Sequence, residues 1–274
     1  MAPIAAHAAW HMGRWDEMQT YVDGIDGVIG ETNSSTGAFL RAVLCIRRGD
    51  TEAAMVNIES ARELLGTELS ALVGESYERA YGDMVRVQQL MELEEVIEYS
   101  RAGSVAAPDA AEHRRALTRG MWRGRLRGVQ RNVEVWQALL SVRSLVLPMH
   151  EDQDTWLRFA SLCRKNGRVG QSYRMLLQLL GYNPLAVTEP GVQGFGAGSG
   201  NPSVMFAFLK HLWATGKRAE AHRRLEELVA EIAGEGNQHP HHAAAWGSLE
   251  HSAVPPQQHQ QHQQQLAAGG GGGG

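Results

Sequence analysis

The chain has little of what marks a disulfide-bonded, membrane-spanning or metal-binding protein. Its two cysteines, Cys45 and Cys163, lie far apart inside apolar helical patterns, so we expect buried free thiols rather than a disulfide or a metal site. No run approaches the roughly eighteen apolar residues of a membrane-spanning helix, and the N-terminus lacks a basic segment followed by an apolar run. These absences predict a cytoplasmic protein without a membrane span.

Acidic and basic residues nearly balance each other, at 30 and 26. The formal net charge of −4 over 274 residues is too small to indicate a general nucleic-acid binder or an acidic tail. Isoleucine, threonine, phenylalanine and tyrosine are sparse, whereas alanine, leucine, methionine and valine make up most of the 43% hydrophobic residues. This composition supports a substantial core and favours helices over strands.

Apolar residues recur at helical spacing in paired segments separated by a glycine turn. Such pairs occupy residues 37–65, 154–181 and 203–233, and an incomplete copy opens the chain. One amphipathic hairpin cannot bury its own apolar stripe, so several must stack. We therefore predict an all-α fold, an α-solenoid of tetratricopeptide- or HEAT-like helical hairpins. The expected turns contain Gly13, Gly49, Gly167 and Gly216.

The hairpin at 154–181 matches the tetratricopeptide pattern in some detail. A proline after the second helix is expected to end it, because proline cannot donate a backbone hydrogen bond. An ordinary helical hairpin would give the apolar stripes without the tryptophan and proline together. The matching residues are Trp156, Ala160, Gly167, Ser172, Leu176, Leu179 and Pro184.

Two longer helical stretches, 66–100 and 112–147, are predicted between the hairpins, joined by a linker at 103–110. Glycine and proline predict a surface loop at 184–202. From residue 234 onward glutamine, histidine and glycine dominate, which predicts a disordered low-complexity tail over 234–274. Residues 1–233 are expected to form the helical domain.

No motif in the sequence indicates catalysis. The GFGAGSG run at 194–200 has neither the lysine nor the flanking strand and helix of a phosphate-binding loop, so it is interpreted as a flexible connector. The histidines of the tail lack the spacing of metal ligands and have no cysteine or carboxylate cluster beside them. The acids at 151–154 precede a helix and are interpreted as N-terminal capping. A glycine-rich ATP loop, a catalytic-loop aspartate and a metal-binding Asp-Phe-Gly are all missing. We expect no cofactor that serves catalysis.

A basic stretch runs from residue 114 to residue 131 without an acidic residue. One interpretation is a surface helix whose charges pair with the neighbouring acids Glu92, Glu94, Glu95 and Glu98. The other is a surface for an anionic ligand or partner, since guanidinium forks suit phosphate. Nucleic acid is not expected, because Trp122 is the only aromatic residue in the stretch. Its arginines are Arg114, Arg115, Arg119, Arg123, Arg125, Arg127 and Arg131.

Several long strings resemble the FAT domain of target-of-rapamycin (TOR) protein kinases, members of the phosphatidylinositol-3-kinase-related kinase family. The similarity covers about residues 5–233 in the family's order. The clearest strings are GAFLRAVLCIRRGD at 37–50, ARELLGTELSALVGESYERAYGDMV at 61–85 and VEVWQALLSVRSLVLPMHEDQDTWLRFASLCRKNGR at 133–168.

The resemblance implies a non-catalytic helical scaffold that clamps a serine/threonine kinase domain further along the same polypeptide, in nutrient and growth signalling. Its implied partners are that kinase domain and the other subunits of a TOR complex. The implied location is cytoplasmic, with endomembranes and the nucleus as further sites of the parent protein. The low-complexity tail stands where further FAT helices are expected, which suggests a fragment or a mispredicted gene model. The alternative function is a free-standing tetratricopeptide-like adaptor that binds another protein.

The FAT domains that this chain resembles also hold inositol hexakisphosphate in a basic pocket. By motif, Arg131 of VQRNVEVW, Lys165 of LCRKNGR and Lys210 of FAFLKHLW fall at pocket positions, and Arg158 of TWLRFASL is their expected neighbour. The four residues come from three predicted helices or their ends, as a shared polyanion site requires. The resemblance therefore implies inositol hexakisphosphate as a structural ligand.

Overall fold

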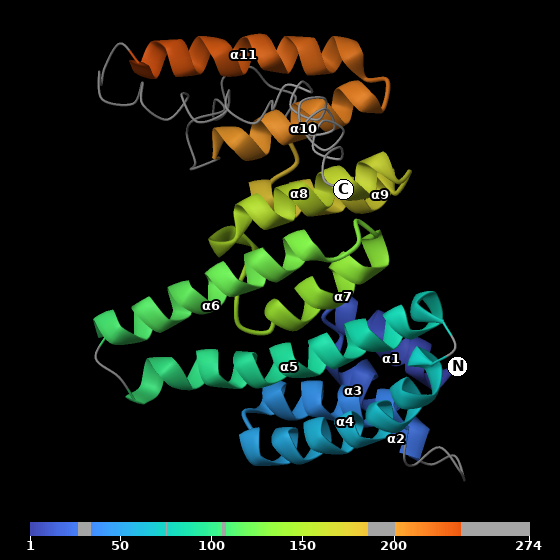
Figure 1. The fold of residues 1–274 in the computed structure, drawn as a ribbon. Helices are drawn as coiled ribbons and strands as arrows, with labels where there is room; N and C mark the ends of the chain where they lie inside the picture. The colour runs from blue at the N-terminus through green and yellow to red at the C-terminus, as the bar shows by residue number, and fades with distance from the viewer. Residues whose placement is uncertain (27–33, 75, 106–107, 186–200, 237–274) are drawn as a thin grey trace, which may run out of the picture.

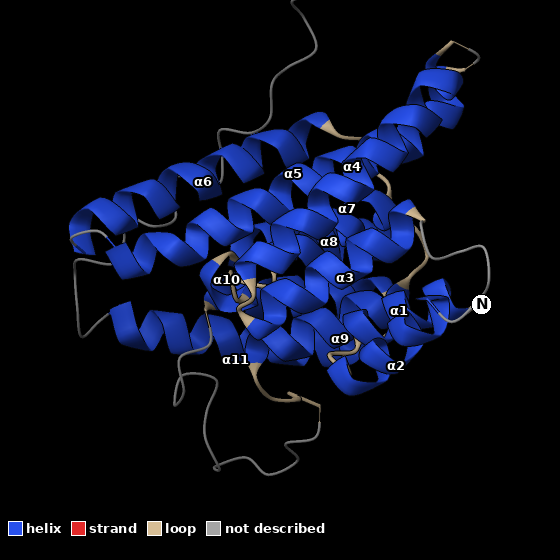
Figure 2. Ribbon diagram, turned by 90° about the horizontal axis from the view of Figure 1, so that it is seen from below, coloured by secondary structure: helices blue, strands red, loops and turns tan. Residues whose placement is uncertain are grey.

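The computed structural model describes residues 1–26, 34–74, 76–105, 108–185 and 201–236. Within these ranges the chain forms eleven α-helices and one short 3-10 helix, and no strand (Figure 2). The helices are α1 (Ala2–His11), α2 (Trp15–Asp26), α3 (Ser35–Arg48), α4 (Thr51–Val73), α5 (Tyr77–Val105), α6 (Pro108–Gly128), α7 (Val133–Arg143), α8 (Gln153–Lys165), α9 (Val169–Leu180), α10 (Pro202–Ala214) and α11 (Arg218–Gly236).

The helices stack one upon another from α1–α4 at one end of the molecule to α10 and α11 at the other (Figure 1). The pairs α1/α2, α3/α4, α8/α9 and α10/α11 are antiparallel hairpins whose members pack directly against each other. This arrangement confirms the predicted all-α solenoid of helical hairpins. The stack buries an apolar stripe of each helix against the next, which no single hairpin could do alone.

Glycines at positive φ make the four predicted turns. Gly13, Gly49, Gly167 and Gly216 have φ angles of 70°, 80°, 76° and 85°. A side chain in this left-handed region meets the following carbonyl, so glycine is the residue that ends each first helix here. After Gly49, the Asp50 carboxylate accepts a hydrogen bond from the Ala53 amide at 3.0 Å and starts α4.

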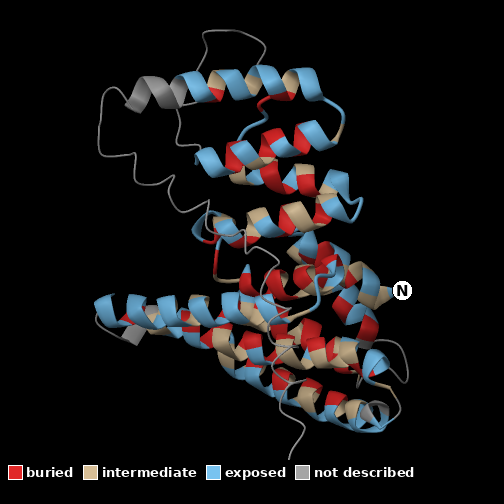
Figure 3. Cartoon of the chain, turned by 45° about the horizontal axis from the view of Figure 1, so that its top comes forward, coloured by how far each residue is buried: buried red, intermediate tan, exposed pale blue. Residues whose placement is uncertain are grey.

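Buried apolar residues form two clusters that follow each other along the stack. Buried positions are coloured red in Figure 3. The first fills the space among α1 to α5 and includes Leu40, Ile58 and Leu93. The second fills the space among α7 to α11 and includes Phe159 and Phe208. Helix α6 contributes Trp122 to the first cluster and Leu126 to the second. The rest of α6 is largely exposed, so its arginines face solvent or neighbouring helices.

A buried ion pair links α5 to α7 beside these clusters. The Arg143 guanidinium donates to both carboxylate oxygens of Glu92, at 2.8 Å from Nε and 2.7 Å from Nη2. The side chains of Arg143 and Glu92 are 3% and 0% exposed. Gln88 donates a further hydrogen bond to Glu92. The Trp122 ring lies 5.8 Å from the guanidinium carbon, so charge and aromatic surface meet in the same junction.

The predicted long helices differ from those in the structure. Helix α4 continues to Val73, and the predicted linker at 103–110 is mostly helical, because α5 ends at Val105 and α6 begins at Pro108. The predicted helix at 112–147 is wrong as a single element. It breaks at 129–132, where the Asn132 side chain accepts hydrogen bonds from the amides of Glu134 and Val135 and starts α7.

Two local predictions about helix ends are also corrected. Pro184 does not end α9, because the helix stops at Leu180 and Gly181 caps it with φ 77°. Asp152 stands at the N-cap of α8 but makes no capping hydrogen bond with its side chain. Its carboxylate instead accepts a hydrogen bond from Arg123 Nε at 2.9 Å. Of the predicted acids, only Asp154 lies in the first turn of α8.

Both cysteines are free thiols, as expected, but only Cys163 is buried as predicted, whereas Cys45 is half-buried. Burial raises the pKa of Cys163 to about 11, so the thiol is inert at neutral pH.

Helix α10 begins at Pro202, and α11 reaches Gly236, slightly beyond the predicted boundary at 233. Most of the predicted loop at 184–202, with the GFGAGSG run, and residues 237–274 of the predicted tail lie outside the described residues. Within the described ranges, no helix has the length and apolar character needed to cross a lipid bilayer.

Candidate functional site

The arginines of α6 divide into paired and unpaired side chains. Arg125 donates to both carboxylate oxygens of Glu95, at 2.8 Å and 2.7 Å, and these bonds raise the pKa of its guanidinium. Arg119 pairs with Glu112 and donates to the Tyr99 hydroxyl at 2.9 Å. Ion pairing with a neighbouring acidic helix, the first interpretation of the basic stretch, is thus confirmed at Arg125.

The other predicted acidic partners behave differently. Glu94 accepts a hydrogen bond from Arg62 of α4 at 2.7 Å, and Glu92 pairs with Arg143 of α7. Glu98 forms no ion pair with a described residue and borders a cleft between α5 and α6. The glutamates of α5 therefore pair with arginines from three helices, α4, α6 and α7. Several arginines of α6 consequently keep N–H donors that no α5 carboxylate accepts.

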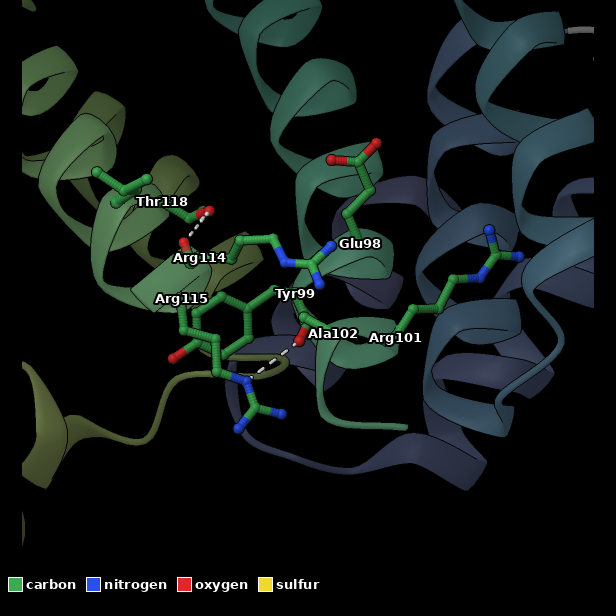
Figure 4. Close-up of a pocket in the computed structure, with 8 residues that line it drawn as sticks. Glu98, Tyr99, Arg101, Ala102, Arg114, Arg115 and Thr118 are labelled. Carbon is green, nitrogen blue, oxygen red and sulfur yellow. Dashed lines mark hydrogen bonds between the residues drawn. The ribbon is translucent and has the colours of Figure 1, made fainter. Parts of the chain in front are cut away.

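The cleft between α5 and α6 has a volume of about 510 Å³ and is lined by three arginines and one glutamate. Arg114 extends from α6 toward Glu98 (Figure 4). Arg115 instead lies over the Tyr99 ring, with its guanidinium carbon 5.3 Å from the ring centroid and its Nε bonded to the Tyr99 carbonyl oxygen at 3.4 Å. Arg101 points away from both, and its Nη2 donates to Thr51 at 2.8 Å (Figure 4). The three guanidinium groups do not converge on one point.

The residues expected to bind inositol hexakisphosphate lie on three separate elements. Arg131 is exposed in the turn ahead of α7, Lys165 in the last turn of α8, and Lys210 in the middle of α10. The Lys210 ammonium lies 4.1 Å from the centroid of the Phe206 ring. Arg158 lines a cavity together with Arg123 and Arg127. The other three predicted residues do not line that cavity.

A larger groove of about 590 Å³ runs between α1 and the α7–α9 region. Its lining combines Trp10 and Trp156 with the polar side chains of Gln137 and Gln171, which are hydrogen-bonded to each other at 2.8 Å. Arg168 borders the same groove and pairs with Glu134. A surface of this kind suits a polypeptide segment, because it offers both apolar area and amide groups.

The described ranges contain one serine–histidine contact, which joins Ser172 Oγ to His211 Nδ1 at 3.3 Å. Both residues are buried, at 1% and 3% exposure, and burial lowers the pKa of His211. No described carboxylate hydrogen-bonds to this histidine, so the pair lacks access and an orienting group. No cluster of potential metal ligands occurs in the described ranges either.

The Glu92–Arg143 and Arg123–Asp152 pairs are among the charged contacts that the sequence did not predict. Arg143 falls at apolar spacing within α7, three residues after Leu140, and this position could have indicated a buried charge. The Arg123–Asp152 pair joins residues of α6 and the start of α8, and its partners are 29 positions apart. No spacing rule relates such a pair, so only the tertiary arrangement reveals it.

Comparison with known proteins identifies the family of this chain. A family model described as "FAT domain" matches residues 2–268. The serine/threonine-protein kinase TOR of Oryza sativa subsp. japonica is 47% identical over 270 residues, which cover 93% of this chain and 11% of the relative.

Two further relatives agree with this match. The serine/threonine-protein kinase TOR of Arabidopsis thaliana is 50% identical over 247 residues, covering 85% of this chain and 10% of the relative. The serine/threonine-protein kinase TOR2 of Saccharomyces cerevisiae is 40% identical over 233 residues, covering 85% and 9%. The chain thus spans about a tenth of the length of these relatives.

Proposed function

Because the chain belongs to the FAT-domain family, we propose that it is a non-catalytic scaffold segment of a TOR-type serine/threonine protein kinase. In this role it clamps and regulates a kinase domain carried by the longer protein in growth signalling. The main support for the proposal is the 47% identity to a TOR kinase, which extends along nearly the whole chain. The described part of the chain is a helical stack without catalytic groups. We further propose a cytoplasmic location.

The physical basis of a clamp is stiffness. Each helix contacts mainly its neighbours in the stack, and the buried Glu92–Arg143 pair ties α5 to α7. A stack of this kind transmits force along its length, since bending it would separate packed apolar faces. In this role, exposed faces of the described helices contact a kinase domain and other subunits of a TOR complex.

Amide hydrogen exchange tests the clamp directly. The 274-residue chain would be measured alone and with the purified kinase-domain region of the rice relative. The scaffold function predicts slowed exchange on one continuous face that crosses several helices. Unchanged exchange at every helix, under conditions where the chain stays folded, would contradict it.

The groove between α1 and α7–α9 supports a second candidate, a tetratricopeptide-like adaptor that binds a segment of another protein. An adaptor would act without a kinase domain. In the same exchange experiment it predicts no protection by the kinase domain. It also predicts that Gln171→Ala, in the groove wall, weakens capture of a protein partner.

We also propose inositol hexakisphosphate as a structural ligand of Arg131, Lys165 and Lys210, with Arg158 as a fourth contact. All four side chains are exposed, and none forms an ion pair with a described carboxylate. Exposed cations without a carboxylate partner keep their donors available for phosphate. The proposal follows the FAT-domain resemblance and extends to these four residues only.

Calorimetry tests this ligand. Inositol hexakisphosphate should bind the folded chain with an affinity that falls as salt rises, because several phosphates meet several cations. Lys165→Ala combined with Lys210→Ala should weaken binding, whereas Lys217→Ala, at the turn before α11, should not. Unchanged affinity in the double variant would remove these two lysines from the site.

A further inference from the structure

We propose that the cleft between α5 and α6 binds an acidic segment of a partner protein, one that carries glutamate or aspartate side chains together with an apolar anchor. The cleft has a volume of about 510 Å³, within the range of about 300–1,000 Å³ that is typical of ligand pockets. Several side chains of a peptide fit a space of this size. Binding at this cleft does not depend on the scaffold function proposed above.

The arginines of the cleft have no carboxylate partner among the described residues. Helix α6 carries six arginines, and three of them pair with described carboxylates. The two that line the cleft, Arg114 and Arg115, form no ion pair with a described residue, and Arg101 of α5 donates to the Thr51 hydroxyl. Guanidinium groups in this state keep donors for incoming carboxylates. They point in different directions (Figure 4), which suits several carboxylates spread along a chain rather than one compact anion.

An exposed apolar strip of α6 runs beside these arginines. Arg114, Leu117, Thr118 and Met121 follow one another at i, i+3, i+4 and i+7, so they share one face of the helix. On this face Leu117 is 61% exposed and Met121 is 41% exposed. Apolar side chains gathered on an exposed face are typical of interaction sites. Leu117 lines the cleft itself, so an apolar side chain of the partner would cover it there.

Glu98 favours a polypeptide over other anions. Its carboxylate lies in the cleft wall, forms no ion pair with a described residue, and has Arg114 extending toward it (Figure 4). A phosphate backbone offers only acceptor oxygens, which a carboxylate repels. A polypeptide also offers backbone N–H donors, which Glu98 can accept. The Tyr99 ring is buried and covered by Arg115, so it offers no free face on which a base could stack.

Fluorescence anisotropy tests the proposal. The probe is a short fluorescein-labelled peptide in which leucines recur at helical spacing among glutamates, and the 274-residue chain is titrated into it. We expect saturable binding that weakens as salt rises, because exposed charges are screened. The same peptide with every glutamate replaced by glutamine should bind at least about tenfold more weakly, since its charge-assisted contacts are lost. No saturable binding, or equal binding of the two peptides, would overturn the proposal.

A charge reversal locates the site. Arg114→Glu should weaken binding of the acidic peptide at least about tenfold, because attraction becomes repulsion. Arg114 is exposed and its side chain makes no hydrogen bond with a described residue, so the fold should be unaffected.

The matched control is Arg127→Glu, at another exposed arginine of α6 without a described carboxylate partner. Residue 127 lies about 20 Å from residue 114 along the helix axis. This distance is about twice the Debye length at 0.1 M salt, so the control should leave the affinity nearly unchanged. Equal weakening by both substitutions would show general attraction to α6 and overturn the proposal.

The apolar contact and the class of partner are tested in the same assay. Leu117→Ser should weaken binding at least about fivefold, because the partner loses a leucine side chain to cover. Leu225→Ser, at an exposed leucine of α11, should not. Equal effects of these two substitutions would also contradict the proposal.

A single-stranded RNA oligonucleotide serves as competitor and should not displace the peptide. Displacement that Arg114→Glu abolishes would identify a nucleic-acid site and overturn the proposal. Unchanged hydrogen exchange in the presence of the kinase domain would refute only the scaffold function, because the peptide titration uses this chain alone.

Discussion

Replacing Arg143 by methionine should unfold the chain at a much lower temperature. The Glu92 carboxylate is 0% exposed and takes two hydrogen bonds from Arg143. With the guanidinium gone, a charge would remain in the core with only the Gln88 amide as a described donor. Breaking a buried pair by removing one partner costs about 3–5 kcal/mol. At about 2–4 °C per kcal/mol for a chain of this size, the melting temperature should fall by roughly 6–20 °C.

This cost arises from the uncompensated charge of Glu92 rather than from lost packing. Glu92→Leu combined with Arg143→Met replaces both partners by apolar side chains of similar length and leaves no charge behind. Such replacements are often neutral or stabilising. The double variant should therefore be more stable than Arg143→Met alone, although it carries one more substitution.

The assay is urea unfolding followed by circular dichroism on the wild-type chain, both single variants and the double variant. The double-mutant cycle should give a coupling energy of about 2 kcal/mol or more between the two positions. A cost below about 1 kcal/mol for Arg143→Met, or a double variant as unstable as the sum of the single variants, would refute the reasoning. The pair would then be a weak, solvated contact.

Three further predictions concern other parts of the stack. Gly167→Ala should destabilise the chain by about 1–2 kcal/mol in urea unfolding, because residue 167 has a φ angle of 76°. Phe208→Ala should cost about 3–5 kcal/mol in the same assay, since Phe208 is fully buried in the second core cluster. Burial and the nearby charges of His11 and Arg86 lower the pKa of His7 from 6.5 to about 4. The unfolded chain therefore binds this proton first, and stability should fall by up to about 3 kcal/mol between pH 6.5 and pH 4; His7→Phe should flatten that fall.

The hairpins were predictable because local rules govern them. Gly49 and Gly167 interrupt apolar stripes of helical spacing. A glycine at such a place indicates a left-handed residue that ends the first helix, and both glycines have positive φ angles. The break between α6 and α7 was not foreseen. It depends on the Asn132 side chain capping α7 instead of continuing one long helix, a competition that apolar periodicity does not register.

The candidate sites were less predictable than the fold. Pairing of Arg125 with Glu95 follows from charge patterns on neighbouring helices, and it was anticipated. The cavity lined by Arg123 and Arg158 was not, because it forms where α6 and α8 approach each other in space. Trp136 resembles an ordinary core residue in the sequence, and only the structure reveals that its indole N–H lacks an acceptor among the described residues.

Kinase activity of a chimaera tests the scaffold function most directly. Residues 2–233 would replace the matching segment of the rice TOR relative, which is 47% identical to this chain. The scaffold function predicts that the chimaera phosphorylates substrate at a rate comparable to the parent, and that Arg143→Met in the inserted segment reduces the rate by destabilising the stack. A stable, folded chimaera without kinase activity would contradict it, as would activity that is insensitive to complete removal of the segment.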